Sequence, residues 1–184
     1  LDALKDYLVF QLCLHGKTLF KNVRELEPGH LLTVERGRVQ ARRYWQVFYH
    51  VDFDHTEKYF QDQLAELVLD SVDIHQRSDV PIGAYLSGGL DSSIVASVAT
   101  RGGGTGFAGF TGKFSLSEKY DESRYARALA DWRGFPLHEI DITAQDFIDQ
   151  LRSVIYHLDY PVAGPGSFPQ FMVSQLASKH RKVV

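Results

Sequence analysis

The chain has 184 residues, of which 44% are hydrophobic and 23% are charged, and its formal net charge is -3. These values are typical of a soluble globular protein, and they give no electrostatic case for binding nucleic acid or an acidic membrane. No apolar run approaches the roughly 18 residues of a membrane span. A single cysteine, Cys13, excludes an intramolecular disulfide, so we expect a cytoplasmic protein.

The first 50 residues predict a small α+β appendage. Apolar residues at helical spacing predict a helix over residues 1–15. Pro28 and Gly29 predict a turn, and the runs 31–35 and 39–44 around a short turn predict a β-hairpin. The residue types of this segment indicate packing rather than chemistry.

The rest of the chain alternates between strands and helices. A long amphipathic helix capped by Asp54 is predicted to end near residues 76–78. The elements then expected are a strand at 80–86, a helix at 94–100, a strand at 107–114, a helix at 121–133, a strand at 137–142, a helix at 147–158, a helix at 171–179 and a strand at 181–184. This alternation favours an α/β fold with a doubly wound, mostly parallel sheet, which binds ligands beyond the carboxyl ends of its strands.

A glycine-rich stretch, Leu86-Ser87-Gly88-Gly89-Leu90-Asp91-Ser92-Ser93, joins a predicted strand to a predicted helix. Glycines at such a junction let the backbone approach an anion and expose N–H groups to it, so the stretch is typical of a phosphate site. The usual phosphate-loop pattern with its lysine is absent. A carboxylate beside phosphate is repelled by it, and therefore Asp91 indicates a Mg²⁺ ion between the two.

The sequence SGGLDSS resembles the pyrophosphate loop of the ATP pyrophosphatases, and LSGGLDSS resembles the synthetase domain of glutamine-dependent asparagine synthetases. Three further segments resemble the region that joins the glutaminase half to the synthetase half of that family: Thr18-Leu19-Phe20-Lys21, Leu26-x-Pro28-Gly29-His30 and Arg43-Tyr44-Trp45. The resemblance implies an interdomain linker or appendage at residues 1–50. It also implies a partial ATP-pyrophosphatase domain of the adenine nucleotide alpha hydrolase-like fold at residues 51–184.

The resemblance also implies an ATP site and a Mg²⁺ site. Asp91 is expected to hold the metal ion, and the residues expected to contact ATP are Leu86, Ser87, Gly88, Gly89, Asp91, Ser92 and Gly112. Gly112 is expected to read adenine through its backbone, although residues 107–110 could be aligned there instead. Tyr120-Asp121-Glu122-Ser123 matches a family pattern as well, and a helix cap explains it equally.

Many relatives have Leu-Asp-Glu-Pro where this chain has Leu158-Asp159-Tyr160-Pro161. The resemblance implies that Asp159 is catalytic in adenylation or in the attack of ammonia, with Tyr160 in the place of the second acid. A tyrosine can transfer a proton only if its pKa falls well below about 10. Aromatic packing is the alternative interpretation of Tyr160.

The implied function is ATP-dependent amidation of a carboxylate through an acyl-adenylate, with release of AMP and pyrophosphate. The implied substrates are ATP, aspartate and ammonia from glutamine. A related adenylating enzyme such as a β-lactam synthetase, and a nucleotide-binding module without chemistry, are the alternatives. The glutaminase domain and a distal Gly-x-Gly-x-Asp-Glu segment are missing, so we expect a fragment of a larger ligase that is inactive alone. The oligomeric state is left open.

Overall fold

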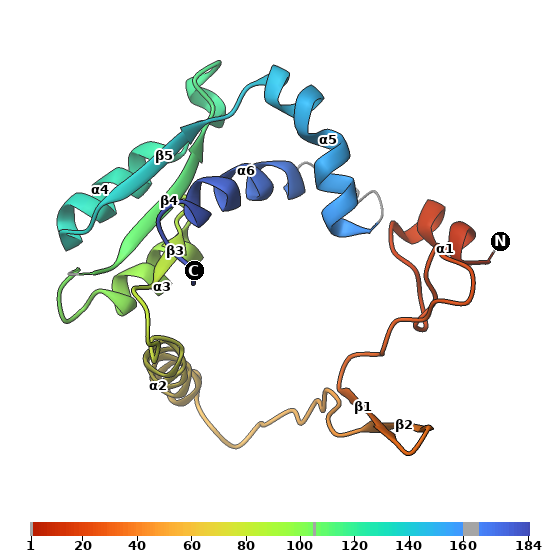
Figure 1. Ribbon diagram of the computed structural model, residues 1–184. Coiled ribbons are helices and arrows are strands. Elements are labelled where there is room, and N and C mark those ends of the chain that lie inside the picture. Colours follow the sequence, from red (N-terminus) through yellow and green to blue (C-terminus); the bar gives the residue numbers. More distant parts are fainter. Residues whose placement is uncertain (1, 105, 160–165) are drawn as a thin grey trace. The chain divides into compact units, whose positions relative to one another are not determined.

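The computed structural model describes residues 2–104, 106–159 and 166–184 (Figure 1). The described residues divide into two compact units. Unit 1 contains residues 2–54 together with Leu158 and Asp159, and unit 2 contains residues 55–157 and 166–184. In the described part of the chain, no helix is both long enough and apolar enough to cross a membrane.

Unit 1 begins with a helix that is shorter than predicted. Helix α1 is Asp2–Phe10, whereas the apolar spacing predicted a helix through residue 15. Gln11 has a φ of 62°, which takes the chain out of the helical conformation. The Asp6 carboxylate then accepts a hydrogen bond from Leu14 N at 3.1 Å and pairs with Lys17, so the chain folds back along the helix.

The predicted hairpin of unit 1 is confirmed. Strand β1 (His30–Glu35) pairs antiparallel with β2 (Arg38–Arg43). Arg36 and Gly37 between them have φ values of 49° and 77°, the two positive values that a type I′ turn requires. Four apolar side chains share one face of the hairpin, namely Leu32, Val34, Val39 and Ala41, whereas Leu31 lies on the other face.

No described residue of unit 1 is buried. On the apolar face of the hairpin, Leu32 is 49% exposed and Val34 is 66% exposed. An isolated two-stranded hairpin is at best marginally stable in water. Unit 1 therefore has no hydrophobic core of its own.

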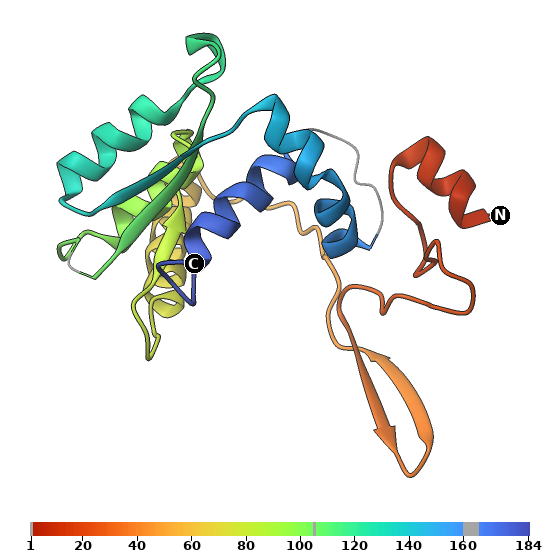
Figure 2. The ribbon, with the colours of Figure 1, turned by 45° about the horizontal axis from the view of Figure 1, so that its top comes forward.

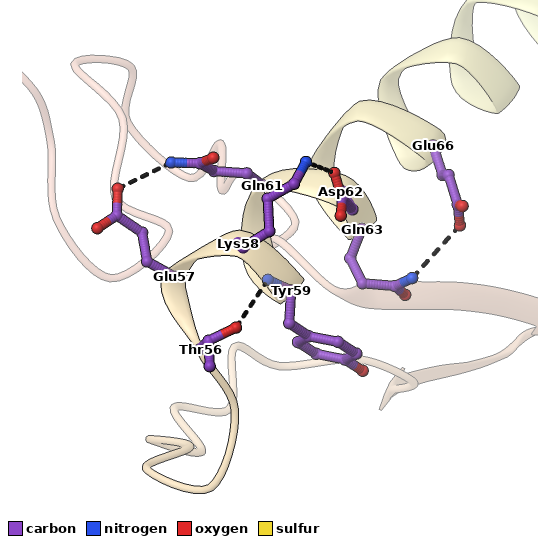
Figure 3. Close-up of polar contacts among 8 residues, drawn as sticks. All are labelled: Thr56, Glu57, Lys58, Tyr59, Gln61, Asp62, Gln63 and Glu66. Atoms are coloured by element: carbon purple, nitrogen blue, oxygen red, sulfur yellow. Dashed lines mark hydrogen bonds and ion pairs between the residues drawn. The ribbon is translucent and has the colours of Figure 1, made fainter.

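Unit 2 begins with the long helix α2 (Glu57–His75), whose cap differs from the predicted one. Thr56, and not Asp54, is the N-cap, and its hydroxyl accepts a hydrogen bond from Tyr59 N at 3.3 Å (Figure 3). Three side-chain pairs follow along the first turns: Glu57 with Gln61, Lys58 with Asp62, and Gln63 with Glu66. The helix buries none of its residues and packs against α3.

The sheet of unit 2 is parallel, as predicted. Its three strands, β3 (Gly83–Tyr85), β4 (Ala108–Lys113) and β5 (Leu137–Asp141), lie in the order β3-β4-β5. Val183 forms a parallel bridge with Ile82 at the free edge of β3, which is where the predicted last strand begins. Strands β4 and β5 thus lie on one side of β3, and the segment at Val183 lies on the other side.

Helices cover both faces of this sheet (Figures 1 and 2). Helices α3 (Leu90–Ala99) and α4 (Ser123–Arg133) share one core with Leu86, Ala96, Phe107, Ala126, Ala130 and Phe135. Helix α6 (Ser167–Ser178) covers the other face, and its Val173 and Ala177 pack against Ala108 and Phe110 of β4. Helix α5 (Ala144–Leu158) joins that side through Val154, which clusters with Ile142, Phe168 and Met172. The predicted α/β class is confirmed.

Helix α4 corrects a detail of the prediction at its start. The sequence predicted acidic residues inside its first turn, but Asp121 and Glu122 precede the helix, which begins at Ser123. The carboxylate of Asp121 accepts a hydrogen bond from Ser123 N at 3.0 Å. Gly134 ends the helix as predicted, with a φ of 73°.

Candidate functional site

The glycine-rich loop lies at the carboxyl end of β3. Strand β3 ends at Tyr85 and α3 begins at Leu90, four residues before the predicted start at residue 94, so Leu86 to Gly89 form the loop. Asp91 therefore lies in the first helical turn. The first N–H groups of a helix have no partner within it and carry a partial positive charge, so this end of α3 can bind an anion.

Hydrogen bonds among its own residues shape the loop. Ser87 Oγ accepts from Gly89 N at 3.2 Å, and the Ser92 hydroxyl donates to Gly89 O at 3.1 Å. Ser87 Oγ and Ser92 Oγ lie 3.0 Å apart. Because the single proton of Ser92 is already used, Ser87 is the donor in this last pair. The predicted serines thus order the loop from within.

Gly88 packs against the start of α4. It has a φ of 88°, and a Cβ atom at this position would lie 2.5 Å from the carbonyl oxygen of Glu122. Both the backbone conformation and the contact therefore require glycine. The Tyr120-Asp121-Glu122-Ser123 segment, explained from the sequence as a helix cap, also adjoins the loop.

The position of the loop in the sheet suits ligand binding. Strand β3 has β4 on one side and the final segment, at Val183, on the other. The chain order reverses at β3, and open α/β sheets bind ligands at such a switch point, outside the carboxyl ends of the strands. The loop is located at this point.

A cavity of about 240 Å³ adjoins the loop, and we call it the loop cavity. Its buried lining residues are Leu86, Phe110, Thr111 and Val173. Its exposed lining residues are Ser87, Glu122, Gly166 and Gln170. Whole small-molecule sites span roughly 300–1,000 Å³, so this cavity has room for only part of a nucleotide.

Gly112 lines the loop cavity where β4 extends beyond β3. The last pair between these strands is Tyr85 with Phe110, whereas β4 stays paired with β5 as far as Lys113. Backbone groups alternate between the two edges of a strand, and Phe110 O accepts from Leu86 N on the β3 side. The N–H and C=O of Gly112 therefore face the edge that β3 has left free, where a ligand can reach them.

Packing also explains why residue 112 is a glycine. A Cβ atom there would lie 2.6 Å from Ile142 Cδ1 and 3.3 Å from Val173 Cγ2. A larger residue would push these side chains into the core under α6.

The carboxylate of Asp91 can contribute to a metal site but cannot form one alone. Asp91 is exposed, and it does not line the loop cavity. Across the described residues, no three His, Cys, Asp or Glu side chains come together as a metal site. Mg²⁺ is commonly held by one or two carboxylates together with substrate phosphates and water, so a single aspartate at the loop fits this metal.

A second negative charge lies at the start of α4. The N–H and the hydroxyl of Ser123 hold the pKa of Asp121 below its ordinary value, and the more distant charges of Arg127 and Lys113 act in the same direction. This carboxyl group is therefore ionised at neutral pH.

The structure brings together some of the predicted site residues. Three of them line the loop cavity: Leu86, Ser87 and Gly112. Four more form the loop and the first turn of α3: Gly88, Gly89, Asp91 and Ser92. Asp159 has a φ of 64° and belongs to unit 1. Tyr160 lies outside the described residues.

Nine of the described residues that line the loop cavity were not predicted as site residues, and three of the nine bear on the arguments below: Tyr85, Glu122 and Gln170. Two of them had a sequence signal, because Tyr85 precedes Leu86 directly and Glu122 lies in the matched Tyr120–Ser123 pattern. Gln170 had none, since its place depends on how α6 packs on the sheet.

Known proteins resemble this chain over most of its length. Asparagine synthetase (glutamine-hydrolyzing) 1 of Bacillus subtilis (strain 168) is 30% identical over 183 residues, which are 97% of this chain and 28% of that relative. Asparagine synthetase (glutamine-hydrolyzing) 3 of the same organism is 28% identical over 79% of this chain and 26% of its own length. Amidase chyE of Penicillium rubens is 28% identical over 81% of this chain and 25% of its own length.

The chain thus spans between 25% and 28% of the length of these relatives. The family described as Asparagine synthase matches residues 63–184, which include the loop, the whole sheet and α6. This match covers more than half of the chain, and the chain belongs to the asparagine synthase family.

Proposed function

We propose that unit 2 binds ATP and Mg²⁺ and supports the transfer of AMP to a carboxylate. The observation that carries this proposal is the glycine-rich loop between β3 and α3, located at the switch point of a parallel sheet and beside the free edge of β4. Membership of the asparagine synthase family supports the same conclusion.

The proposed reaction has two steps. A carboxylate oxygen of the acceptor attacks the α-phosphorus of ATP and forms an O–P bond, while the bond from that phosphorus to the bridging oxygen breaks and pyrophosphate leaves. Ammonia then attacks the carbonyl carbon of the acyl-adenylate, AMP leaves with its new oxygen, and one proton is released. The products are an amide, AMP and pyrophosphate.

The loop would act mainly in the first step. Negative charge increases on pyrophosphate as it leaves, and the N–H groups at the start of α3 can stabilise that charge without rearranging. The Ser87 and Ser92 hydroxyls would fix the shape of the loop through their hydrogen bonds to each other and to Gly89. Asp91 would hold Mg²⁺, which neutralises phosphate charge. The backbone of Gly112 would read the adenine base.

The acceptor and the nitrogen source form the finer part of the proposal. Two of the relatives carry names that state asparagine synthesis with glutamine hydrolysis, whereas a third is named an amidase. We propose aspartate as the acceptor and ammonia from glutamine as the nucleophile, delivered by a glutaminase part of the full-length protein. Asp159 and Tyr160 would then act on the acceptor or on ammonia.

The test of this function is Asp91→Asn in the full-length protein that carries this sequence. Removing the carboxylate charge removes the metal ligand, so ATP–pyrophosphate exchange should fall by about a hundredfold or more, as it does when a major electrostatic group is lost. Glutamine hydrolysis should be unchanged, because the loop takes no part in it. Exchange is measured with labelled pyrophosphate and hydrolysis by glutamate release.

Asp131→Asn is the matched control, since Asp131 is an exposed aspartate of α4 that does not line the loop cavity. This variant should keep both activities. Normal exchange in Asp91→Asn would show that the loop is not the pyrophosphate site.

A further inference from the structure

One residue that lines the loop cavity, Gln170, carries a planar amide group. Such a group can donate and accept hydrogen bonds in the same plane. Of the described residues that line the cavity, only Gln170 carries an amide. Gln170 is exposed, whereas the buried lining consists of Leu86, Phe110, Thr111 and Val173. Gln170 is thus an exposed polar residue of a largely apolar pocket, and a few polar groups in such a pocket fix the orientation of a ligand.

Hydrogen bonds tie the backbone of Gln170 to the strand that leads into the loop. The Ser174 hydroxyl donates to Gln170 O at 2.7 Å, and Ser174 Oγ lies 2.9 Å from the hydroxyl of Tyr85. Ser174 has a single hydroxyl proton, so Tyr85 is the donor in the second bond. The turn of α6 that bears Gln170 is thus held against β3, one residue before the loop begins.

Polar backbone groups of β4 also line the cavity. Gly112 lines the same cavity, and its N–H and C=O face the edge that β3 leaves free. These groups can bond only one edge of a flat base. A second edge of the base would remain free for a side chain, and Gln170 is the described α6 residue lining the cavity that has polar side-chain atoms.

We propose that Gln170 determines nucleotide specificity by recognising the adenine base of ATP. The amide oxygen would accept from the 6-amino group while the amide nitrogen donates to a neighbouring ring nitrogen, the bidentate pairing that glutamine makes with adenine. This inference rests on the proposed function, because it assigns the base of the same ATP molecule whose phosphates the loop would hold.

The test compares ATP with purine riboside triphosphate, which lacks the 6-amino group. Binding of each to the full-length protein is measured by titration calorimetry with Mg²⁺ present, so that no turnover is needed. The native protein should bind ATP about tenfold more tightly than the analogue, the scale of one good bidentate contact. Gln170→Leu should lower the affinity for ATP and bring the two affinities together, and Gln170→Met should do the same.

Gln175→Leu is the matched control, because Gln175 is an exposed glutamine of the same helix and does not line the loop cavity. It should keep the native preference for ATP. If Gln170→Leu also keeps that preference, the role of Gln170 is overturned while the proposed ATP site stands. If the native protein binds neither triphosphate, the proposed function fails, and the role of Gln170 fails with it.

Discussion

Gly88 couples the loop to the rest of unit 2. Its φ of 88° lies in the left-handed region, and the Glu122 carbonyl occupies the space that a side chain would need. The start of α4 is thereby packed against the loop and helps to set where the N–H groups of the loop lie. The loop is not an independent turn, since its shape depends on a neighbour about 34 residues away along the chain.

Gly88→Ala should therefore impair ATP chemistry more than stability. The left-handed conformation costs an L-residue about 1–2 kcal/mol, and the contact with Glu122 forces the loop to shift as well. A displacement of about 1 Å can cost a hundredfold in rate, so ATP–pyrophosphate exchange should fall by about that factor. Exchange assays and urea unfolding measure the two effects.

Gly134→Ala tests the effect of backbone strain at a positive φ without a steric clash. Gly134 has a φ of 73°, and no described atom lies within 4 Å of the position of a Cβ atom there. This variant should lose about the same 1–2 kcal/mol of stability but keep ATP–pyrophosphate exchange. Equal loss of exchange in both variants would contradict the role given to the contact with Glu122.

At the scale of elements, the start of α5 shows local residue types determining a helix boundary. Asp146 N donates to Thr143 Oγ1 at 3.1 Å, and Thr143 N donates to Asp146 Oδ2 at 2.9 Å. Each side chain thus accepts a hydrogen bond from the backbone N–H of the other residue, and the predicted capping pair is confirmed. The hydrogen bonds from the hydroxyl and the N–H of Thr143 lower the pKa of Asp146.

Thr143→Ala should destabilise unit 2 by about 1 kcal/mol, because it leaves the N–H of Asp146 in the first turn without its partner. Urea unfolding followed by circular dichroism measures the change. Gln145→Ala is the control from the same turn: Gln145 bonds Asp149 across an exposed face at 2.9 Å, and such a pair contributes only a few tenths of a kcal/mol. A loss for Thr143→Ala no larger than for the control would show that the cap does not stabilise α5.

At the scale of the whole unit, the end of the chain is held to the sheet by a cluster of rings and a guanidinium group. His138 of β5 stacks on Phe110 with ring centroids 5.2 Å apart, and on His180 at 3.9 Å. Arg181 donates to Ile82 O at 3.2 Å and to Gly106 O at 3.1 Å. The residues after α6 thereby join β3, β4 and β5.

This cluster should make stability depend on pH. Burial, and then the nearby charges of His180 and Arg181, lower the pKa of His138 from 6.5. Between that lowered pKa and 6.5 the unfolded chain binds more protons than the folded one, so folding stability is greatest above pH 6.5 and falls as the pH drops below it. The free energy of unfolding, measured by urea titration across this window, should show the decline.

His138→Phe should flatten that decline, because phenylalanine keeps the ring stack but cannot be protonated. His75→Gln, at an exposed histidine of α2, should keep the native pH dependence. An unchanged slope in His138→Phe would exclude His138 as the source.

Local patterns in the sequence were enough to predict most elements of unit 2. The 3.6-residue spacing of apolar residues predicted α2, α5 and the body of α4, and Gly134 predicted where α4 ends. The alternation of strands with helices predicted the parallel sheet. Errors fell at boundaries, such as the cap of α2 at Thr56, because neighbouring hydroxyl and carboxyl residues can compete for the same backbone N–H groups.

The position of the loop was also predictable, because the glycine-rich stretch follows an apolar run typical of a buried strand and precedes a helical pattern. Only the tertiary structure showed that Gly88 contacts Glu122 and that β4 extends beyond β3 at Gly112. It also showed that Gln170 of α6 lines the loop cavity together with Gly112. Each of these relations depends on how separate elements are packed and registered against one another. Packing of this kind is set by contacts between residues far apart in the chain, and no local pattern records it.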